Sequence, residues 1–315
     1  MPRATKSDAV AAAALTGTGT TSIAVRLRAI VPSLSRSEQR VATQVLEDPG
    51  SVAASTITEL AERCGTSETT VIRFCRTLGM SGYPQLRLTL ATEAGRADNG
   101  TSRVVGSDIG PGDDLAQIVE KIAFADARAV EETAAQLNLE ALQAVVDALV
   151  AAGRVDVYGV GASAFVAMDF QQKLHRIGQV AFAWSDTHIA LTSAALLRPG
   201  DVAIGVSHTG VTTDTIDALA EARRRGATTV ALTNFPRSPI TEVADHVLTT
   251  AARETTFRSG AMASRLAQLT LVDFLFVGVA QQTYTETRAA LEATYDAVSG
   301  HRLKPDRPRS DGRRS

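Results

Sequence analysis

The chain has 315 residues, of which 44% are hydrophobic and 21% charged, and its net charge at pH 7 is -2. This length suffices for two domains with cores of their own, and the composition is typical of a folded globular protein. The slightly acidic balance argues against broad nonspecific coating of nucleic acid, but it is compatible with one local DNA-reading surface.

The chain contains two cysteines, Cys64 and Cys75. Two thiols make no disulfide framework, so we expect both to be reduced core residues of a cytoplasmic protein. Residues 1–20 are rich in Ala, Thr and Gly and lack the continuous apolar core of a signal peptide. They are expected to form a flexible arm.

Residues 23–93 have a helical pattern throughout. The segment around Ser35 is expected to open a helix that runs to Glu47. The run Asp48-Pro49-Gly50 combines three turn formers, which predicts that the helix stops there.

Two shorter helices are expected next. Thr56 and Glu59 have the spacing of a capping box, in which each side chain bonds to the backbone N–H of the other. Gly65 then breaks the helix, and Ser67 is placed to cap the following one. The first of these helices has one apolar stripe, formed by Ile57, Leu60, Ala61 and Cys64.

The second helix divides into an apolar and a polar face. The apolar face consists of Val71, Phe74, Cys75 and Leu78. The opposite face carries Thr69, Arg73 and Arg76, with Thr70 at its border. Arg suits guanine edges and phosphates, and Thr suits phosphates and thymine methyl groups, so this face fits a major groove. A plain helical hairpin with a solvated basic face is the alternative.

The segment from Thr69 to Tyr83 reads Thr-Thr-Val-Ile-Arg-Phe-Cys-Arg-Thr-Leu-Gly-Met-Ser-Gly-Tyr. It closely resembles the helix-turn-helix of RpiR/MurR-type transcriptional regulators, in which an Arg-Phe run, a Leu-Gly pair and a Gly-aromatic pair close the recognition helix. Tyr83 is expected to pack under the following helix. The resemblance implies that DNA is bound through Ser67, Thr69, Thr70, Arg73 and Arg76.

A linker and a second, mixed region follow. Residues 95–112 lose periodicity and gather Gly, Asp, Asn and Ser, which indicates a linker, and helices are expected near 113–137 and 139–152. Short β-type runs then alternate with helical stretches, at Val155–Val160, Val180–Phe182, Val202–Val206, Thr229–Leu232 and His246–Thr249. This alternation predicts a parallel sheet with helices on both faces and ligands beyond the carboxyl ends of the strands.

Glycines and a hydroxyl follow the first β run, in Gly159-Val160-Gly161-Ala162-Ser163-Ala164. The spacing nearly matches a dinucleotide fingerprint, and Asp186 lies where a ribose-binding acid would be. A dinucleotide site is therefore one alternative. It has no use, however, for the second hydroxyl-rich turn described next.

The third β run ends in Ser207-His208-Thr209-Gly210-Val211-Thr212, and a helical pattern follows directly. Backbone N–H groups at a helix start, joined by Ser and Thr hydroxyls, are typical of a phosphate site. Ser207, Thr209 and Thr212 are expected to cradle the phosphate of a compact sugar, and Ser163 to meet its hydroxyls. The alternative is that these hydroxyls only cap a helix.

Residues 152–280 resemble the SIS (sugar isomerase) domain, a phosphosugar-binding α/β fold, and the stretch from Arg253 to Leu269 is again similar to the regulator family. The resemblance implies a flavodoxin-like three-layer sandwich and places Glu254 near the sugar. His208 is expected to be an exposed loop histidine. The expected effector site comprises Gly161, Ser163, Ser207, Thr209, Gly210, Thr212 and Glu254.

Two functions remain open. In a phosphosugar isomerase or lyase whose helical region only mediates assembly, Glu254 would serve as the base and His175 or His188 as the acid. A transcriptional regulator of sugar or amino-sugar metabolism, controlled by a phosphosugar and without catalytic residues, is favoured. A regulator needs to bind the phosphosugar without converting it, and the helix-turn-helix supplies a reason for such binding.

The last segments are a helix and a basic tail. Residues 261–279 are the one candidate membrane span, but Arg265, Gln268 and Asp273 are costly in lipid, so a buried or dimer-facing helix is expected. Residues 300–315, rich in Arg and Pro, are expected to be disordered.

The predicted organisation is thus an arm at 1–20, an all-α DNA-binding domain at 21–95, a linker at 96–112, an SIS domain at 113–299 and a tail at 300–315. The expected partners are a near-palindromic double-stranded DNA operator and a small phosphosugar. We expect a homodimer or homotetramer, no membrane contact, no metal and no cofactor.

Overall fold

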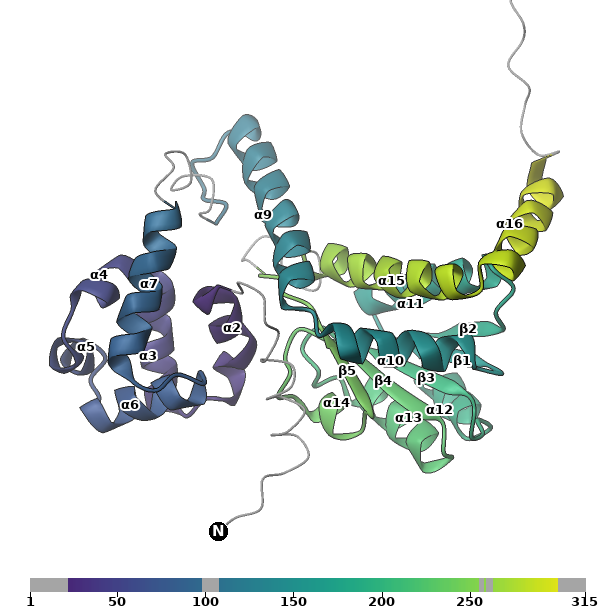
Figure 1. Ribbon diagram of the computed structural model, residues 1–315, viewed down its shortest axis with the longest axis horizontal. Coiled ribbons are helices and arrows are strands. Elements are labelled where there is room, and N and C mark those ends of the chain that lie inside the picture. Colours follow the sequence, from purple (N-terminus) through teal and green to yellow (C-terminus); the bar gives the residue numbers. More distant parts are fainter. Residues whose placement is uncertain (1–21, 98–107, 255–257, 259–262, 300–315) are drawn as a thin grey trace, which may run out of the picture.

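The computed structural model describes residues 22–97, 108–254, 258 and 263–299 (Figure 1). The predicted arm, most of the predicted linker and the basic tail lie outside these residues, so the structure does not test them. Among the described residues, no helix combines the length and apolar character that a membrane crossing needs.

The amino-terminal region is helical, as predicted. Its elements are α2 (Ile23–Ile30), the short 3-10 helix η1 (Val31–Ser33), α3 (Arg36–Glu47), α4 (Pro49–Ala54), α5 (Ile57–Arg63), α6 (Glu68–Thr77) and α7 (Tyr83–Ala97). Their apolar faces share one core, in which Phe74 and Leu27 are completely buried. Cys64 and Cys75 are free thiols in this core, as expected, and burial raises the pKa of Cys75 to about 11.

Asp48 joins two helices. Its N–H donates to the Gln44 carbonyl oxygen at 3.1 Å and ends α3, while its carboxylate accepts from the Ser51 N–H at 2.9 Å and begins α4. The run Asp48-Pro49-Gly50 was predicted only to end a helix, and α4 was not predicted. Pro49 at the first position of a helix needs no backbone donor, so the same residues that end one helix start the next.

The expected caps of α5 and α6 are confirmed. Thr56 and Glu59 form the capping box of α5, and Ser67 accepts from the Thr70 N–H at 3.3 Å at the start of α6. Tyr83 is buried, and its hydroxyl donates to the Val52 and Ser55 carbonyl oxygens, both at 3.1 Å. Tyr83 is thus buried, but it begins α7 itself and contacts the end of α4, so it does not pack under a following helix as predicted.

The second region begins with α9 (Leu115–Gln136) and α10 (Leu139–Val150), close to the predicted helices. The described strands, β1 (Val155–Tyr158), β2 (Ala181–Trp184), β3 (Val202–Val206), β4 (Thr228–Thr233) and β5 (His246–Thr249), form one parallel sheet in the order β2-β1-β3-β4-β5. This is the flavodoxin-like order, which confirms the predicted fold class.

Helices cover both faces of the sheet (Figure 1). On one face, α10, α11 (Ala162–Arg176) and α15 (Ala263–Gln282) pack on alternate strand residues such as Val202, Ile204 and Val206. On the other, α12 (Thr187–Ala194), α13 (Thr213–Arg224) and α14 (Pro239–Glu242) pack on Ala203 and Ala231. Burial of both faces explains why the strands read as continuous apolar runs. The final helix is α16 (Tyr284–Ser299).

The helical region touches the second region through α2. Arg28 on α2 lies 3.9 Å from the Glu132 carboxylate on α9, and burial lowers the pKa of this arginine. A shallow hollow at this contact is lined by Val25 and Arg28 and by Asn234 and Thr250, which follow β4 and β5. The carboxyl edge of the sheet therefore adjoins the helical region.

Candidate functional site

The predicted DNA-reading residues lie on or next to α6, whose fold follows from its sequence. Val71, Phe74 and Cys75 are buried, which leaves the opposite face in solvent. Of the predicted contacts, Ser67, Thr69, Arg73 and Arg76 are exposed.

Thr70 is placed differently. It is only 9% exposed, and its Oγ1 atom lies 3.1 Å from the Ser67 Oγ atom, within hydrogen-bonding distance. Because the threonine lies at the border of the apolar face, it packs into the helical core. Thr70 is thus the least accessible of the predicted DNA contacts, and Ser67 has part of its hydrogen-bonding capacity taken by the helix cap.

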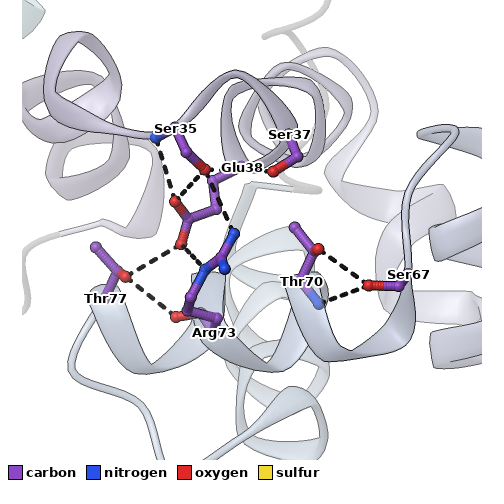
Figure 2. A network of polar contacts seen from close by, with 7 residues as sticks. All are labelled: Ser35, Ser37, Glu38, Ser67, Thr70, Arg73 and Thr77. Atoms are coloured by element: carbon purple, nitrogen blue, oxygen red, sulfur yellow. Dashed lines mark hydrogen bonds and ion pairs between the residues drawn. The ribbon is translucent and has the colours of Figure 1, made fainter.

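Arg73 has a partner that the sequence analysis missed (Figure 2). Its Nε atom donates to the Glu38 Oε1 atom at 3.1 Å, and Glu38 comes from α3. The Glu38 Oε2 atom accepts from the Ser35 N–H at 3.2 Å and from the Ser35 hydroxyl at 2.5 Å. The Ser35-x-x-Glu38 spacing signals a capping box, but no local pattern signals the contact across 35 residues.

The turn after β3 is held together by its own hydroxyls. The Ser207 Oγ atom accepts from the Gly210 N–H at 3.1 Å and donates to the Thr212 Oγ1 atom, also at 3.1 Å. Ser207 is buried, Thr212 is half-buried and Thr209 is exposed. The structure thus brings Ser207, Gly210 and Thr212 together, with Thr209 at the solvent side of the same turn.

Gly161 and Ser163 follow the neighbouring strand. β1 and β3 pair directly, with Tyr158 opposite Gly205, so the turns after these strands leave the same edge of the sheet side by side. Gly161 has φ +58°, a conformation that favours glycine, and Ser163 is buried in the first turn of α11. A Cβ atom on Gly159 would lie 2.8 Å from the Ser163 carbonyl oxygen, so this glycine lets the helix approach the strand.

The helices that leave these two turns begin without a side-chain cap. Gly161 before α11 and Thr212 before α13 make no side-chain cap hydrogen bond. By contrast, Asn138 caps α10 and Asp186 caps α12. At α11 the Ser163 and Ala164 N–H groups donate to the Val160 and Gly161 carbonyl oxygens, both at 3.2 Å, so the open donors lie mainly at α13. There, together with the helix dipole, they favour an anion.

Glu254 lies after β5 and contacts the start of α15. Its Oε1 atom accepts from the Ser264 N–H at 2.8 Å, while its Oε2 atom is buried and has no hydrogen-bond partner among the described residues. The side chains of Ser264 and Gln268, one helical turn apart on α15, are fully buried and likewise unpartnered within that part of the chain. These two residues were not predicted, because buried polar groups on a helix give no local signal.

His208 is not the exposed histidine that the sequence analysis expected. It is half-buried, its ring lies edge-on to Phe235 with centroids 5.6 Å apart, and its Nδ1 atom has no partner among the described residues. Burial lowers the pKa of His208, and the Glu254 carboxylate partly opposes this. The charge of Glu254 thus acts on His208, although no hydrogen bond joins the two side chains within the described residues.

The other predicted candidates lie elsewhere. His175 stands in the last turn of α11, twelve positions after Ser163, which is about 18 Å along a helix. Its Nδ1 atom is 2.6 Å from the Gln171 side chain. His188 is exposed on α12, and the Asp186 carboxylate accepts from the Ile189 N–H at 3.0 Å. Asp186, the acid that a dinucleotide site would use for ribose, therefore serves as the cap of α12.

Two family models match the chain. The helix-turn-helix domain of the rpiR family matches residues 21–96, and the SIS domain matches residues 148–278. An uncharacterised HTH-type transcriptional regulator of Caldanaerobacter subterraneus is 39% identical over 90% of this chain and 99% of its own length. A second such regulator, from Haemophilus influenzae, is 34% identical over 89% of this chain and 97% of its own.

Solved structures agree with this assignment. The Vibrio vulnificus NanR protein complexed with ManNAc-6P matches with a TM-score of 0.57 and 31% identity, over 89% of this chain and 99% of that one. The sugar isomerase domain of an RpiR transcription factor from Sphaerobacter thermophilus matches with a TM-score of 0.53 and 30% identity, over 57% of this chain and 99% of that one. A helix-turn-helix joined to an SIS domain defines a class of transcriptional regulator, and this chain belongs to its rpiR family.

Proposed function

We propose that the protein is a sequence-specific DNA-binding regulator of sugar or amino-sugar metabolism whose affinity for its operator is set by a phosphosugar. The phosphosugar binds at the carboxyl edge of the sheet, and α6 reads the DNA. One observation carries the proposed effector site: α11 and α13, which follow the adjacent strands β1 and β3, both begin without a side-chain cap.

The phosphate is assigned to the turn after β3. Ser207, Thr209 and Thr212 supply hydroxyls there, and the first turn of α13 supplies N–H groups. None of these is a fixed positive charge, so a dianion is held by dipoles and is released readily. The sugar extends toward Gly161 and Ser163 on one side and toward Glu254 on the other.

The relatives support an amino-sugar phosphate as the first effector to test. The NanR protein of Vibrio vulnificus was solved with ManNAc-6P, and it matches this chain over nearly the full length of both. Glu254, Ser264 and Gln268 offer buried polar atoms without partners among the described residues, which suits the hydroxyl and amide groups of such a sugar.

The DNA-bound form is proposed to be a homodimer or homotetramer on a near-palindromic operator, because paired reading heads require paired half-sites. The effector changes the pose of the heads. Two connections carry the change: residues 95–112, and the contact of α2 with α9 and the ends of β4 and β5. Its size is limited by the difference in effector affinity between the two poses.

The test combines Ser207→Ala with Thr209→Ala. Wild-type protein is expected to gain thermal stability with ManNAc-6P and to change its affinity for promoter DNA. The double variant is expected to lose both responses and to retain DNA binding without effector. Thr192→Ala, which removes an exposed hydroxyl on α12, is the control. An undiminished response in the double variant would refute the phosphate site.

An isomerase is the competing function, and the buried Glu254 Oε2 atom, which has no hydrogen-bond partner among the described residues, is the observation that favours it. A carboxylate base in a sugar site can move a proton beside a carbonyl. Incubation of the protein with ManNAc-6P and glucosamine-6-phosphate, followed by product analysis, separates the two. We expect no turnover, and turnover that Glu254→Gln abolishes would favour the enzyme.

A further inference from the structure

The contact between Glu38 and Arg73 joins a buried to an exposed side chain. The Glu38 side chain is 8% exposed and that of Arg73 is 58% exposed. The carboxylate also accepts from the Thr77 hydroxyl at 3.5 Å, so donors surround it on α3 and α6 (Figure 2). A buried carboxylate with this many donors keeps one orientation and acts as a fixed anchor.

The charge of Glu38 is kept despite its burial. Burial alone raises the pKa of a carboxyl group, but hydrogen bonds from Ser35 and Arg73 bring the pKa of Glu38 below its ordinary value. The anchor is therefore an anion at neutral pH. It attracts the guanidinium that reaches it from the recognition helix.

Glu38 and Ser35 contact one edge of that guanidinium. The Nε atom is bonded to Glu38, and the Nη2 atom lies 3.5 Å from the Ser35 hydroxyl. No hydrogen bond to Nη1 is made within the described residues. The group is planar and rigid, so holding its Nε–Nη2 edge against Glu38 and Ser35 fixes its plane and leaves the outer N–H groups of both terminal nitrogens available to DNA. Two such nitrogens match the O6 and N7 atoms of guanine.

We propose that Glu38 is a positioning residue that turns Arg73 from a mobile phosphate contact into a reader of one guanine. This inference rests on the proposed DNA contact of α6. Arg76 on the same face is exposed and has no hydrogen bond or ion pair within the described part of the chain, so it lacks a comparable anchor. Glu38 thereby contributes sequence specificity without touching DNA.

The same helical region contains a matched control. Glu59 occupies the corresponding capping-box position of α5, but among the described residues its side chain is hydrogen-bonded only to Thr56. Glu59→Gln removes the same charge from the same kind of helix start. It leaves the anchor of Arg73 in place.

The experiment uses the full chain and two DNA probes. The first is a duplex enriched from a random-sequence library by the wild-type protein, and the second is poly(dI-dC). Affinities for both are measured at several salt concentrations for the wild type, Glu38→Gln, Glu59→Gln, Arg73→Ala and the Glu38→Gln/Arg73→Ala double variant. Thermal midpoints are measured in parallel.

Glu38→Gln is expected to lower the ratio of specific to nonspecific affinity about tenfold, in the range of one bidentate base contact. Nonspecific affinity is expected to hold or rise, because a negative charge near the phosphates is removed. Glu59→Gln keeps the wild-type ratio. In the Arg73→Ala background, Glu38→Gln has no further effect, since the residue through which it acts is gone.

An equal loss of both affinities in Glu38→Gln would show a merely structural role and overturn the proposal. An unchanged ratio, or a loss that persists beside Arg73→Ala, would overturn it too. If Glu38→Gln fails to fold, Ser35→Ala loosens the same anchor and takes its place. Unchanged binding in Arg73→Ala would instead refute the proposed recognition face of α6.

Discussion

Gly210 lies so close to Ser238 that a Cβ atom on the glycine would be 2.1 Å from the serine Oγ atom. The glycine also has φ +66°, and its carbonyl oxygen accepts from the Ile240 N–H at 3.0 Å. The turn after β3 is therefore seated directly on the segment that begins α14. Its shape depends on a residue without a side chain.

Gly210→Ala is expected to cost about 2 kcal/mol of stability and to abolish the response to ManNAc-6P, because backbone strain and the clash with Ser238 act together. Gly200→Ala is the control, since Gly200 has φ +94° but open space around a Cβ atom. That variant is expected to lose stability and keep the response. Thermal shift with and without ManNAc-6P measures both, and a Gly210→Ala protein that still responds would contradict the prediction.

Arg154→Ala is expected to destabilise the second region by about 3 kcal/mol. Arg154 bonds both carboxylate oxygens of Asp156, at 2.7 and 3.0 Å, and Asp156 is completely buried. The variant leaves that carboxylate without its counter-charge. Urea denaturation measures the loss, and Arg224→Ala, which removes a more exposed pair with Glu221, should cost less than about 1 kcal/mol. Equal losses would show that burial of the pair is not decisive.

Tyr83→Phe is expected to lower stability by about 1–2 kcal/mol and to leave DNA affinity and its salt dependence unchanged. The hydroxyl serves two buried carbonyl oxygens, those of Val52 and Ser55, and burial raises its pKa. Denaturation and DNA titration of one preparation give both values. A reduced DNA affinity at every salt concentration would mean that Tyr83 reaches phosphate after all.

His208 is expected to make stability depend on pH. Burial holds its pKa below the ordinary value of 6.5, so the unfolded chain binds the proton more readily than the folded one. Its contribution is complete above pH 6.5 and is lost as the pH falls below it. Denaturation from about pH 7.5 to about pH 5.5 should show a steeper loss for the wild type than for His208→Gln. His188→Gln, at an exposed position of α12, should follow the wild type.

The sequence predicted the strands to within about two residues because apolar runs such as Val202–Val206 end sharply at polar or turn-forming residues. Helix caps such as Thr56 and Ser67 were also predicted correctly, because a cap bonds to residues only three positions further along the chain. The anchor of Arg73 was not, because Glu38 is distant in sequence. The burial of His208 was missed for the same reason, since Phe235 lies on another loop.

Asp48 is the single residue between α3 and α4. One residue supplies the last backbone donor of the first helix and the side-chain acceptor of the second, so there is no connecting loop to lengthen or shorten. An inserted or deleted residue here would rotate α4 by about 100° and misdirect Val52, its buried side chain. Natural variation in length is therefore expected to avoid this joint.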